Sequence, residues 1–207
     1  MAIIEIVFPQ LKKDPESLKE ALTKLSVALA TFKEGGVQRG LQGFIDSENG
    51  VDVSADAREV LILEWPSEAT FHAFIKSPGF GNFMAQLKPF VNGPPELNLF
   101  ETNAASYLFG ARPFLEILLI RPKNTSNDED VETILKKVQS SLEKVNDSDS
   151  VYGSSLNLPK KIATVIRVFT SKAERDAAKL SPQEISNEVG SLADITRLVA
   201  EVKVLPL

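Results

Sequence analysis

Apolar segments in this sequence follow one order of secondary structure twice. In the first half, two stretches with helical spacing lie between apolar, strand-like runs, and each begins at a good N-cap, Asp14 or Ser67. The helical pattern after Asp14 ends near Gly35 and Gly36. The predicted strands of this half are 3–8, 37–46, 59–65 and 96–102. The first half therefore has the predicted order β-α-β-β-α-β.

The second half repeats this order. The segment "FLEILLIRP" aligns with "IIEIVFP", which places Glu116 in the position of Glu5. A long amphipathic helix follows, and Ser171 and Ser181 mark two further helix starts. The predicted strands of this half are 114–122, 150–158, 161–169 and 195–205.

A doubled β-α-β-β-α-β pattern indicates two ferredoxin-like units. The helices of each unit cover one face of an antiparallel sheet, so the other apolar face must be buried elsewhere. We therefore predict an α+β fold in which two sheets pack face to face as a barrel within one chain. The expected domains are residues 1–102 and 113–207, joined by a linker at 103–112. Gly40 and Gly43 indicate a bulge or a close backbone approach in the second strand.

Composition excludes several classes of function. The sequence of 207 residues contains no cysteine, so disulfides, thiol nucleophiles and cysteine-ligated zinc are excluded. The net charge is −5 and no basic cluster is present, so nucleic acid is not an expected partner. No apolar run approaches the roughly 18 residues of a membrane span, and no signal peptide is recognisable, so we expect a cytoplasmic protein. Nucleotide, zinc-protease and hydrolase motifs do not occur.

The single tryptophan, Trp65, and the single histidine, His72, are candidate site residues. A neutral imidazole can act as a general base near pH 7, but His72 also fits the boundary of an amphipathic helix. Trp65 could stack on an aromatic substrate, or it could pack in the core on the same strand face as Leu61 and Leu63. Both interpretations stay open for each residue.

Three glutamates, Glu5, Glu64 and Glu116, interrupt apolar strands. A carboxylate in such a place is costly unless it is paired. One interpretation is acid–base chemistry in a cavity that raises the pKa. The other is pairing with Arg39 or Arg167, or a position at a solvated edge, and the matching positions of Glu5 and Glu116 favour a structural role repeated in both halves.

The stretch from residue 63 to 90 resembles the dimeric α+β barrel superfamily, and within it the antibiotic-biosynthesis-monooxygenase (ABM) type of domain. The second half matches mainly in element order, with Phe169 in place of the tryptophan and Ser171 as the cap. The chain thus resembles a fused version of the family's dimer. The residues that carry the resemblance are Trp65, Ser67, Phe71, Phe74, Ser77 and Phe80.

The resemblance implies a small-molecule ligand between the sheet and the helices of one unit. It points to a monooxygenase, cyclase or isomerase without metal, nucleotide or other cofactor, acting on an aromatic or polyketide-like compound, as a monomer or homodimer. His72 is the expected catalytic residue, and the expected substrate-binding residues are Trp65, Phe71 and Glu64. Haem is not expected, because His72 is the only histidine that could ligate it.

The alternative is a non-catalytic ligand-binding or stress-associated barrel. An enzyme should have an enclosed cavity of a few hundred Å³, with His72 or a glutamate pointing into it. A non-catalytic barrel should have filled interiors and a solvent-facing His72.

Overall fold

The computed structural model describes residues 2–104, 110, 112–123, 128–145, 147, 150–178 and 182–207. The predicted cap Ser181 and part of the predicted linker 103–112 lie outside these residues. The predicted division into two domains remains a proposal.

The first half contains the predicted strands and helices. Asp14 and Ser67 cap their helices as predicted, by accepting hydrogen bonds from the backbone N–H groups of Ser17 and Thr70 at 2.9 and 3.1 Å. The first helical segment is divided at Ala28 into two helices. The elements are β1 (Ala2–Phe8), α1 (Pro15–Val27), α2 (Leu29–Glu34), β2 (Arg39–Glu48), β3 (Val51–Asp52), η1 (Ser54–Asp56), β4 (Glu59–Trp65), α3 (Glu68–Ile75), α4 (Pro78–Leu87), η2 (Lys88–Phe90) and β5 (Glu96–Thr102).

The second half repeats the order, with shorter helices before its last strand. The strand predicted at 150–158 ends at Ser155, because the chain turns there and the backbone N–H of Ser155 bonds to the carbonyl of Ile162 at 2.9 Å. The elements are β6 (Phe114–Pro122), α5 (Asp128–Lys144), β7 (Val151–Ser155), β8 (Ala163–Phe169), α6 (Lys172–Asp176), α7 (Pro182–Val189) and β9 (Ala193–Val204).

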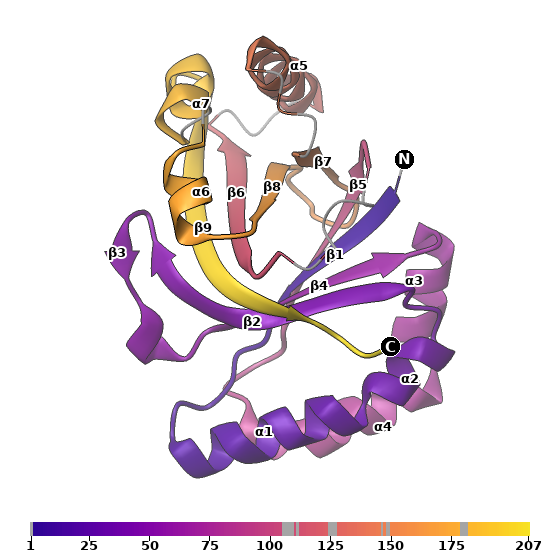
Figure 1. Cartoon of the computed structure of the whole chain (residues 1–207). Helices are drawn as coiled ribbons and strands as arrows, with labels where there is room; N and C mark the ends of the chain where they lie inside the picture. Colours follow the sequence, from indigo (N-terminus) through magenta and orange to yellow (C-terminus); the bar gives the residue numbers. More distant parts are fainter. Residues whose placement is uncertain are drawn as a thin grey trace.

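Eight antiparallel strands close into a barrel. Their order is β2-β4-β1-β5-β7-β8-β6-β9, and pairing of β9 with β2 completes the ring. Each half supplies four consecutive strands, so the seams between the halves are β5–β7 and β2–β9. Helices α1 and α4 lie over the outer face of the first half, and α5 and α7 lie over the second (Figure 1). The predicted α+β barrel of two packed sheets is confirmed.

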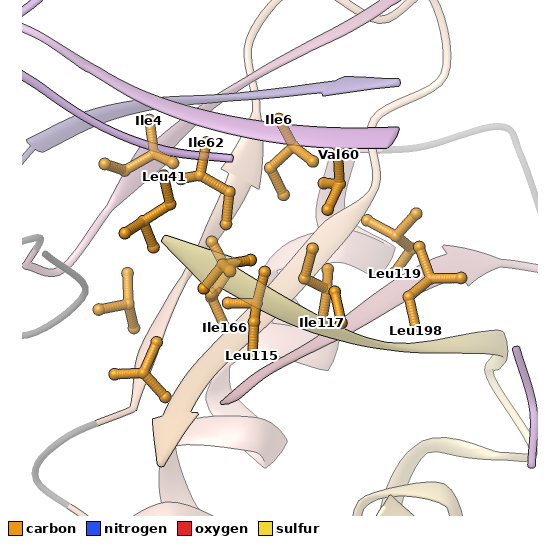
Figure 2. Close-up of a cluster of buried hydrophobic side chains, with 14 of the residues drawn as sticks. Ile4, Ile6, Leu41, Val60, Ile62, Leu115, Ile117, Leu119, Ile166 and Leu198 are labelled. Carbon is orange, nitrogen blue, oxygen red and sulfur yellow. The ribbon is translucent and has the colours of Figure 1, made fainter. Parts of the chain in front are cut away.

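The interior of the barrel is a core to which both halves contribute. Figure 2 shows Ile4 and Ile62 from the first half facing Leu115, Ile117 and Ile166 from the second. Two further cores lie outside the barrel, one between each sheet and its helices. Because side chains alternate along a strand, each strand serves the interior with one set of residues and a helix layer with the other.

Glycines allow the strands to approach closely at both seams. A Cβ on Gly43 in β2 would lie 2.0 Å from the Glu201 carbonyl oxygen in β9, and one on Gly153 in β7 would lie 1.9 Å from that of Glu101 in β5. The predicted close approach in the second strand is therefore confirmed at Gly43. The register shift in β2 lies further along, between Ile45 and Ser47.

We expect Gly43→Ala to lower the free energy of unfolding by about 1–3 kcal/mol, because the added methyl group overpacks the β2–β9 seam. Urea unfolding measures the change. Gly81→Ala in α4 is the control, since a Cβ there meets no atom within 4 Å and alanine favours a helix. Equal losses in both variants would contradict a role of Gly43 at the seam.

Candidate functional site

The helix-facing side of β1 carries one buried carboxyl group, that of Glu5. Ile4 and Ile6 point into the barrel, so Glu5 points outward between the sheet and the helices. The indole Nε1–H of Trp65 in β4 donates a hydrogen bond to Glu5 Oε2 at 2.9 Å. The register of β1 and β4 makes the pair diagonal neighbours, because Glu5 lies opposite Leu63 and Ile3 lies opposite Trp65.

Glu5 lines a small cavity between β1, β4 and α4, with a volume of about 40 Å³. Most of its wall is apolar, including Phe74, Phe80 and Phe83. Glu5 is only 3% exposed, and this burial raises its pKa to about 7 against the opposing effect of the Trp65 hydrogen bond. Its Oε1 accepts no hydrogen bond from the residues that the structure describes. Glu5 therefore places a carboxyl group with a raised pKa on the wall of an apolar cavity.

Trp65 bonds Glu5 but does not line this cavity itself. It is 2% exposed, and its ring centroid lies 5.6 Å from that of Phe71 and 5.2 Å from that of Phe74. Phe71 is equally buried and packs edge-on against Trp65. The aromatic cluster thus fixes the indole that orients the Glu5 carboxyl group.

Glu64, the other residue expected beside Trp65, projects from the opposite face of β4. Neighbouring residues of a strand alternate between faces, and Trp65 faces the helices. Arg39 in β2 binds Glu64 through Nε and Nη2, at 2.5 and 2.9 Å. The predicted pairing with Arg39 is confirmed, and Glu64 does not line the Glu5 cavity.

His72 lies on the outer side of α3. Its side chain is 43% exposed, and its Nε2 lies 3.3 Å from Glu68 Oε1 one turn earlier. It does not line the Glu5 cavity, and its ring contacts Phe71 from outside. The structure therefore does not bring His72 together with Glu5.

We expect His72→Ala to change the free energy of unfolding by less than about 0.5 kcal/mol, as is usual for an exposed residue. Thermal or urea unfolding at pH 7 measures it. A loss above about 1 kcal/mol would contradict the surface position of this side chain.

Glu116 holds the position of Glu5 in the second half, but in different surroundings. Glu116 lies opposite Arg167, as Glu5 lies opposite Leu63. Arg167 Nε donates to Glu116 Oε2 at 2.8 Å, and Arg197 Nε donates to Oε1 at 2.7 Å. The predicted Arg167 pair is confirmed, but the role is not repeated, since no arginine bonds Glu5 among the described residues. A leucine at position 63 leaves the first-half carboxyl group without a cation.

Sequence reasoning missed a second buried acid, Glu59, at the start of β4. It is 1% exposed, and burial raises its pKa to about 7. Gln42 Nε2 donates to Oε1 at 2.5 Å, whereas Oε2 has no hydrogen-bond partner within the described ranges. The sequence signal that could have revealed Glu59 is an acid at the first position of a strand that is buried on both faces.

Within the described parts of the chain, no histidines and acids gather in a group that could hold a metal ion. No described helix is long and apolar enough to cross a membrane.

No protein-family model matches the sequence, and no curated protein matches it. Solved structures do match over almost the whole chain. The "putative monooxygenase" of Lactobacillus acidophilus has a TM-score of 0.60 at 11% identity, covering 98% of this chain and 95% of its own. The "putative monooxygenase" of Fusobacterium nucleatum has a TM-score of 0.60 at 14% identity, covering 99% and 94%. An anthrone oxidase-like protein has a TM-score of 0.62 at 10% identity, covering 98% and 92%.

The chain has the fused ABM-like barrel fold. Each of these neighbours is matched over more than nine-tenths of its length, so the likeness includes both halves and their closure into one barrel. The resemblance expected from residues 63–90 is confirmed at the level of the fold. At identities of 10–14%, the likeness is one of fold alone, and a shared fold does not imply a shared chemistry.

Proposed function

We propose that the first half of this ABM-like barrel binds the flat, apolar part of a small molecule between its sheet and helices, and that Glu5 accepts a proton from it. The observation that carries this proposal is the Glu5 carboxyl group. It is buried in an apolar wall, it has one oxygen free of hydrogen bonds to the described residues, and its pKa is raised to about 7. A base poised near the working pH combines availability with driving force for proton transfer.

Each residue of the site has a separate role in this proposal. Ionised Glu5 removes a proton from a weakly acidic C–H or O–H group, and Trp65 holds the carboxylate by its N–H group. Phe74, Phe80 and Phe83 line the cavity, and they would pack against the rings of a substrate once the cavity widens. The resulting anion reacts with oxygen in a monooxygenase, closes a ring in a cyclase, or is protonated elsewhere in an isomerase. In this proposal Trp65 and Phe71 are positioning residues, and His72 and Glu64 take no part in the proton transfer.

Anthrone is a suitable probe, because one structural neighbour is an anthrone oxidase-like protein and because the methylene group of anthrone is acidic. In deuterated buffer, the protein should accelerate exchange of this methylene group. Glu5→Gln should reduce that acceleration about 100-fold or more, the range for loss of a general base. His72→Ala is the control and should exchange at the wild-type rate. Equal exchange rates in wild type and Glu5→Gln would overturn the proposal.

Oxygen uptake then distinguishes an oxygenase from the other enzymes. An anthrone oxygenase would consume one molecule of oxygen per anthrone and release anthraquinone and water, so that atoms balance. Proton exchange without oxygen uptake would support the base and favour the cyclase or isomerase.

A non-catalytic ligand-binding barrel is the second candidate. The volume of about 40 Å³ favours it, since a few hundred Å³ was expected for an enzyme, and so does the exposed His72. This candidate predicts that the wild-type protein does not accelerate exchange, although small apolar molecules still bind.

A further inference from the structure

A larger hollow lies on the same side of the sheet as the Glu5 cavity. It is a groove of about 630 Å³ between α1–α2 and β2–β9, and residues of both halves line it. Its helix side is apolar, with Leu22 and Leu29, and its sheet side carries Gln42, Glu201 and Lys203. The volume is in the range of sites for small molecules, about 300–1,000 Å³.

Three side chains line both the groove and the Glu5 cavity: Leu25, Phe32 and Leu61. Each is only 4% exposed. They form a partition, with the groove on one side and the Glu5 carboxyl group on the other.

We propose that the groove is the outer part of the ligand site and the entrance to the Glu5 cavity, for an amphipathic molecule with an apolar end and an anionic end. The inference rests on the proposed function of Glu5, whose cavity is too small for such a ligand unless the partition moves. The apolar end passes the partition toward Glu5. The anionic end stays in the groove, on Lys203.

Strand register places the backbone of Lys203 at a defined distance from the partition. Leu61 lies opposite Gln42, and Gln42 lies opposite Lys203, so the three form one row across β4, β2 and β9. Two strand spacings separate Leu61 from Lys203, which is roughly 10 Å. The Lys203 ammonium group makes no ion pair within 4 Å with a described residue, although its charge partly opposes the rise that burial causes in the pKa of Glu59. A carboxylate or sulfonate at the end of a medium-length apolar body fits this spacing.

The neighbouring row carries the opposite charge. Phe44 lies opposite Glu59 in β4 and Glu201 in β9, so both acids lie in the row next to that of Lys203. Glu201 lines the groove and should repel an anion there. Replacement of Lys203 and of Glu201 should therefore change the affinity for an anion in opposite directions.

Helices α1 and α2 meet above the partition, and hydrogen bonds from Ala28 N–H to the Lys24 carbonyl and from Phe32 N–H to the Ala28 carbonyl, both at 3.0 Å, continue the helical pattern across the junction. Ala28 separates α1 from α2, with Leu25 on one side and Phe32 on the other. Helix α2 has only six residues. A shift of α2 would carry Phe32 with it and join the cavity of about 40 Å³ to the groove of about 630 Å³.

Two fluorescent probes with the same ring skeleton test the groove: the anionic 1-anilinonaphthalene-8-sulfonate and the uncharged N-phenyl-1-naphthylamine. Lys203→Met should weaken binding of the sulfonate about fivefold, in keeping with one half-exposed ion pair, and should change binding of the uncharged probe less than twofold. Glu201→Gln should strengthen binding of the sulfonate about twofold. Lys136→Met, on the exposed side of α5, is the matched control and should bind both probes as wild type does.

Octanoate tests passage through the partition, because it should displace the sulfonate from the groove and has no chromophore of its own. Its binding should also change the emission of Trp65, the only tryptophan, which bonds Glu5. Displacement with unchanged Trp65 emission would overturn the entrance. Equal binding of the sulfonate to wild type, Lys203→Met and Glu201→Gln would overturn the anion site.

Glu5→Gln separates this inference from the proposed function. It should bind the sulfonate within twofold of wild type, because Lys203 and the groove are unchanged, while losing the exchange of anthrone protons. If Glu5→Gln exchanges anthrone protons normally but sulfonate binding does depend on Lys203 and Glu201, only the proposed proton transfer is contradicted. If Glu5→Gln loses the exchange but sulfonate binding does not depend on Lys203 and Glu201, only the proposed anion site in the groove is contradicted.

Discussion

Replacing Glu5 with glutamine should make the protein more stable than wild type at pH 8, by about 3 kcal/mol, and should not stabilise it at pH 4. The folded-state pKa of Glu5, about 7, lies above its ordinary value of 4.5. Below pH 4.5 both the folded and the unfolded states hold the proton, so the group does not alter stability. Between pH 4.5 and 7 the unfolded state loses its proton first, so wild-type stability falls as pH rises. Glutamine does not ionise, and its carbonyl can still accept the Trp65 hydrogen bond.

Urea unfolding at pH 4, 6 and 8 measures this effect as the difference between wild type and Glu5→Gln at each pH. Glu59 has a similarly raised pKa, so Glu59→Gln should remove a second, comparable share of the pH dependence. His72→Gln is the control for a polar side chain outside the Glu5 cavity, and it should leave the pH dependence unchanged. A constant difference between wild type and Glu5→Gln across the three pH values would show that Glu5 ionises normally.

The same change at the matching position of the second half should have the opposite result. We expect Glu116→Gln to lower the free energy of unfolding by about 3–5 kcal/mol, because it breaks a buried ion pair and leaves two arginines without the carboxylate that they share. The side chains of Glu116 and Arg167 are 0% and 5% exposed. Arg167 would keep its longer ion pair with Asp147, at 3.8 Å.

Urea unfolding at pH 7 checks this expectation. Glu132→Gln, on the exposed side of α5, is the matched control and should cost less than about 0.5 kcal/mol. A loss below about 1 kcal/mol in Glu116→Gln would contradict the buried ion cluster. Opposite effects at Glu5 and Glu116 would show that the two halves keep a carboxyl group at one register position for different purposes.

Local signals predicted most of the fold. Caps such as Asp14 and Ser67 and the apolar run of β4 act within a few residues, so the sequence alone reveals them. The strand predicted at 150–158 was too long, because its end is set by a turn that closes between Ser155 and Ile162. Closure of the barrel followed from the doubled pattern, since each sheet had an apolar face to bury.

The site was harder to predict, because its contacts join residues distant in the sequence. The bond of Trp65 to Glu5 spans 60 residues and depends on the register of β1 and β4. Trp65 and His72 were candidate site residues because each is the single residue of its type, yet rarity does not show where a side chain points. Because side chains alternate between the two faces of a strand, the sequence of β4 was sufficient to place Glu64 and Trp65 on opposite faces. Burial of Glu59, by contrast, depends on distant segments.

The central claim is that Glu5 changes its protonation near neutral pH while bonded to Trp65. Because Trp65 is the only tryptophan, a nitrogen-15 NMR spectrum contains one indole N–H resonance, and it reports directly on this hydrogen bond. In a pH titration this resonance should shift with a midpoint of about 7 in wild type and should stay constant in Glu5→Gln. A midpoint near 4.5, or the same shift in both proteins, would contradict the account.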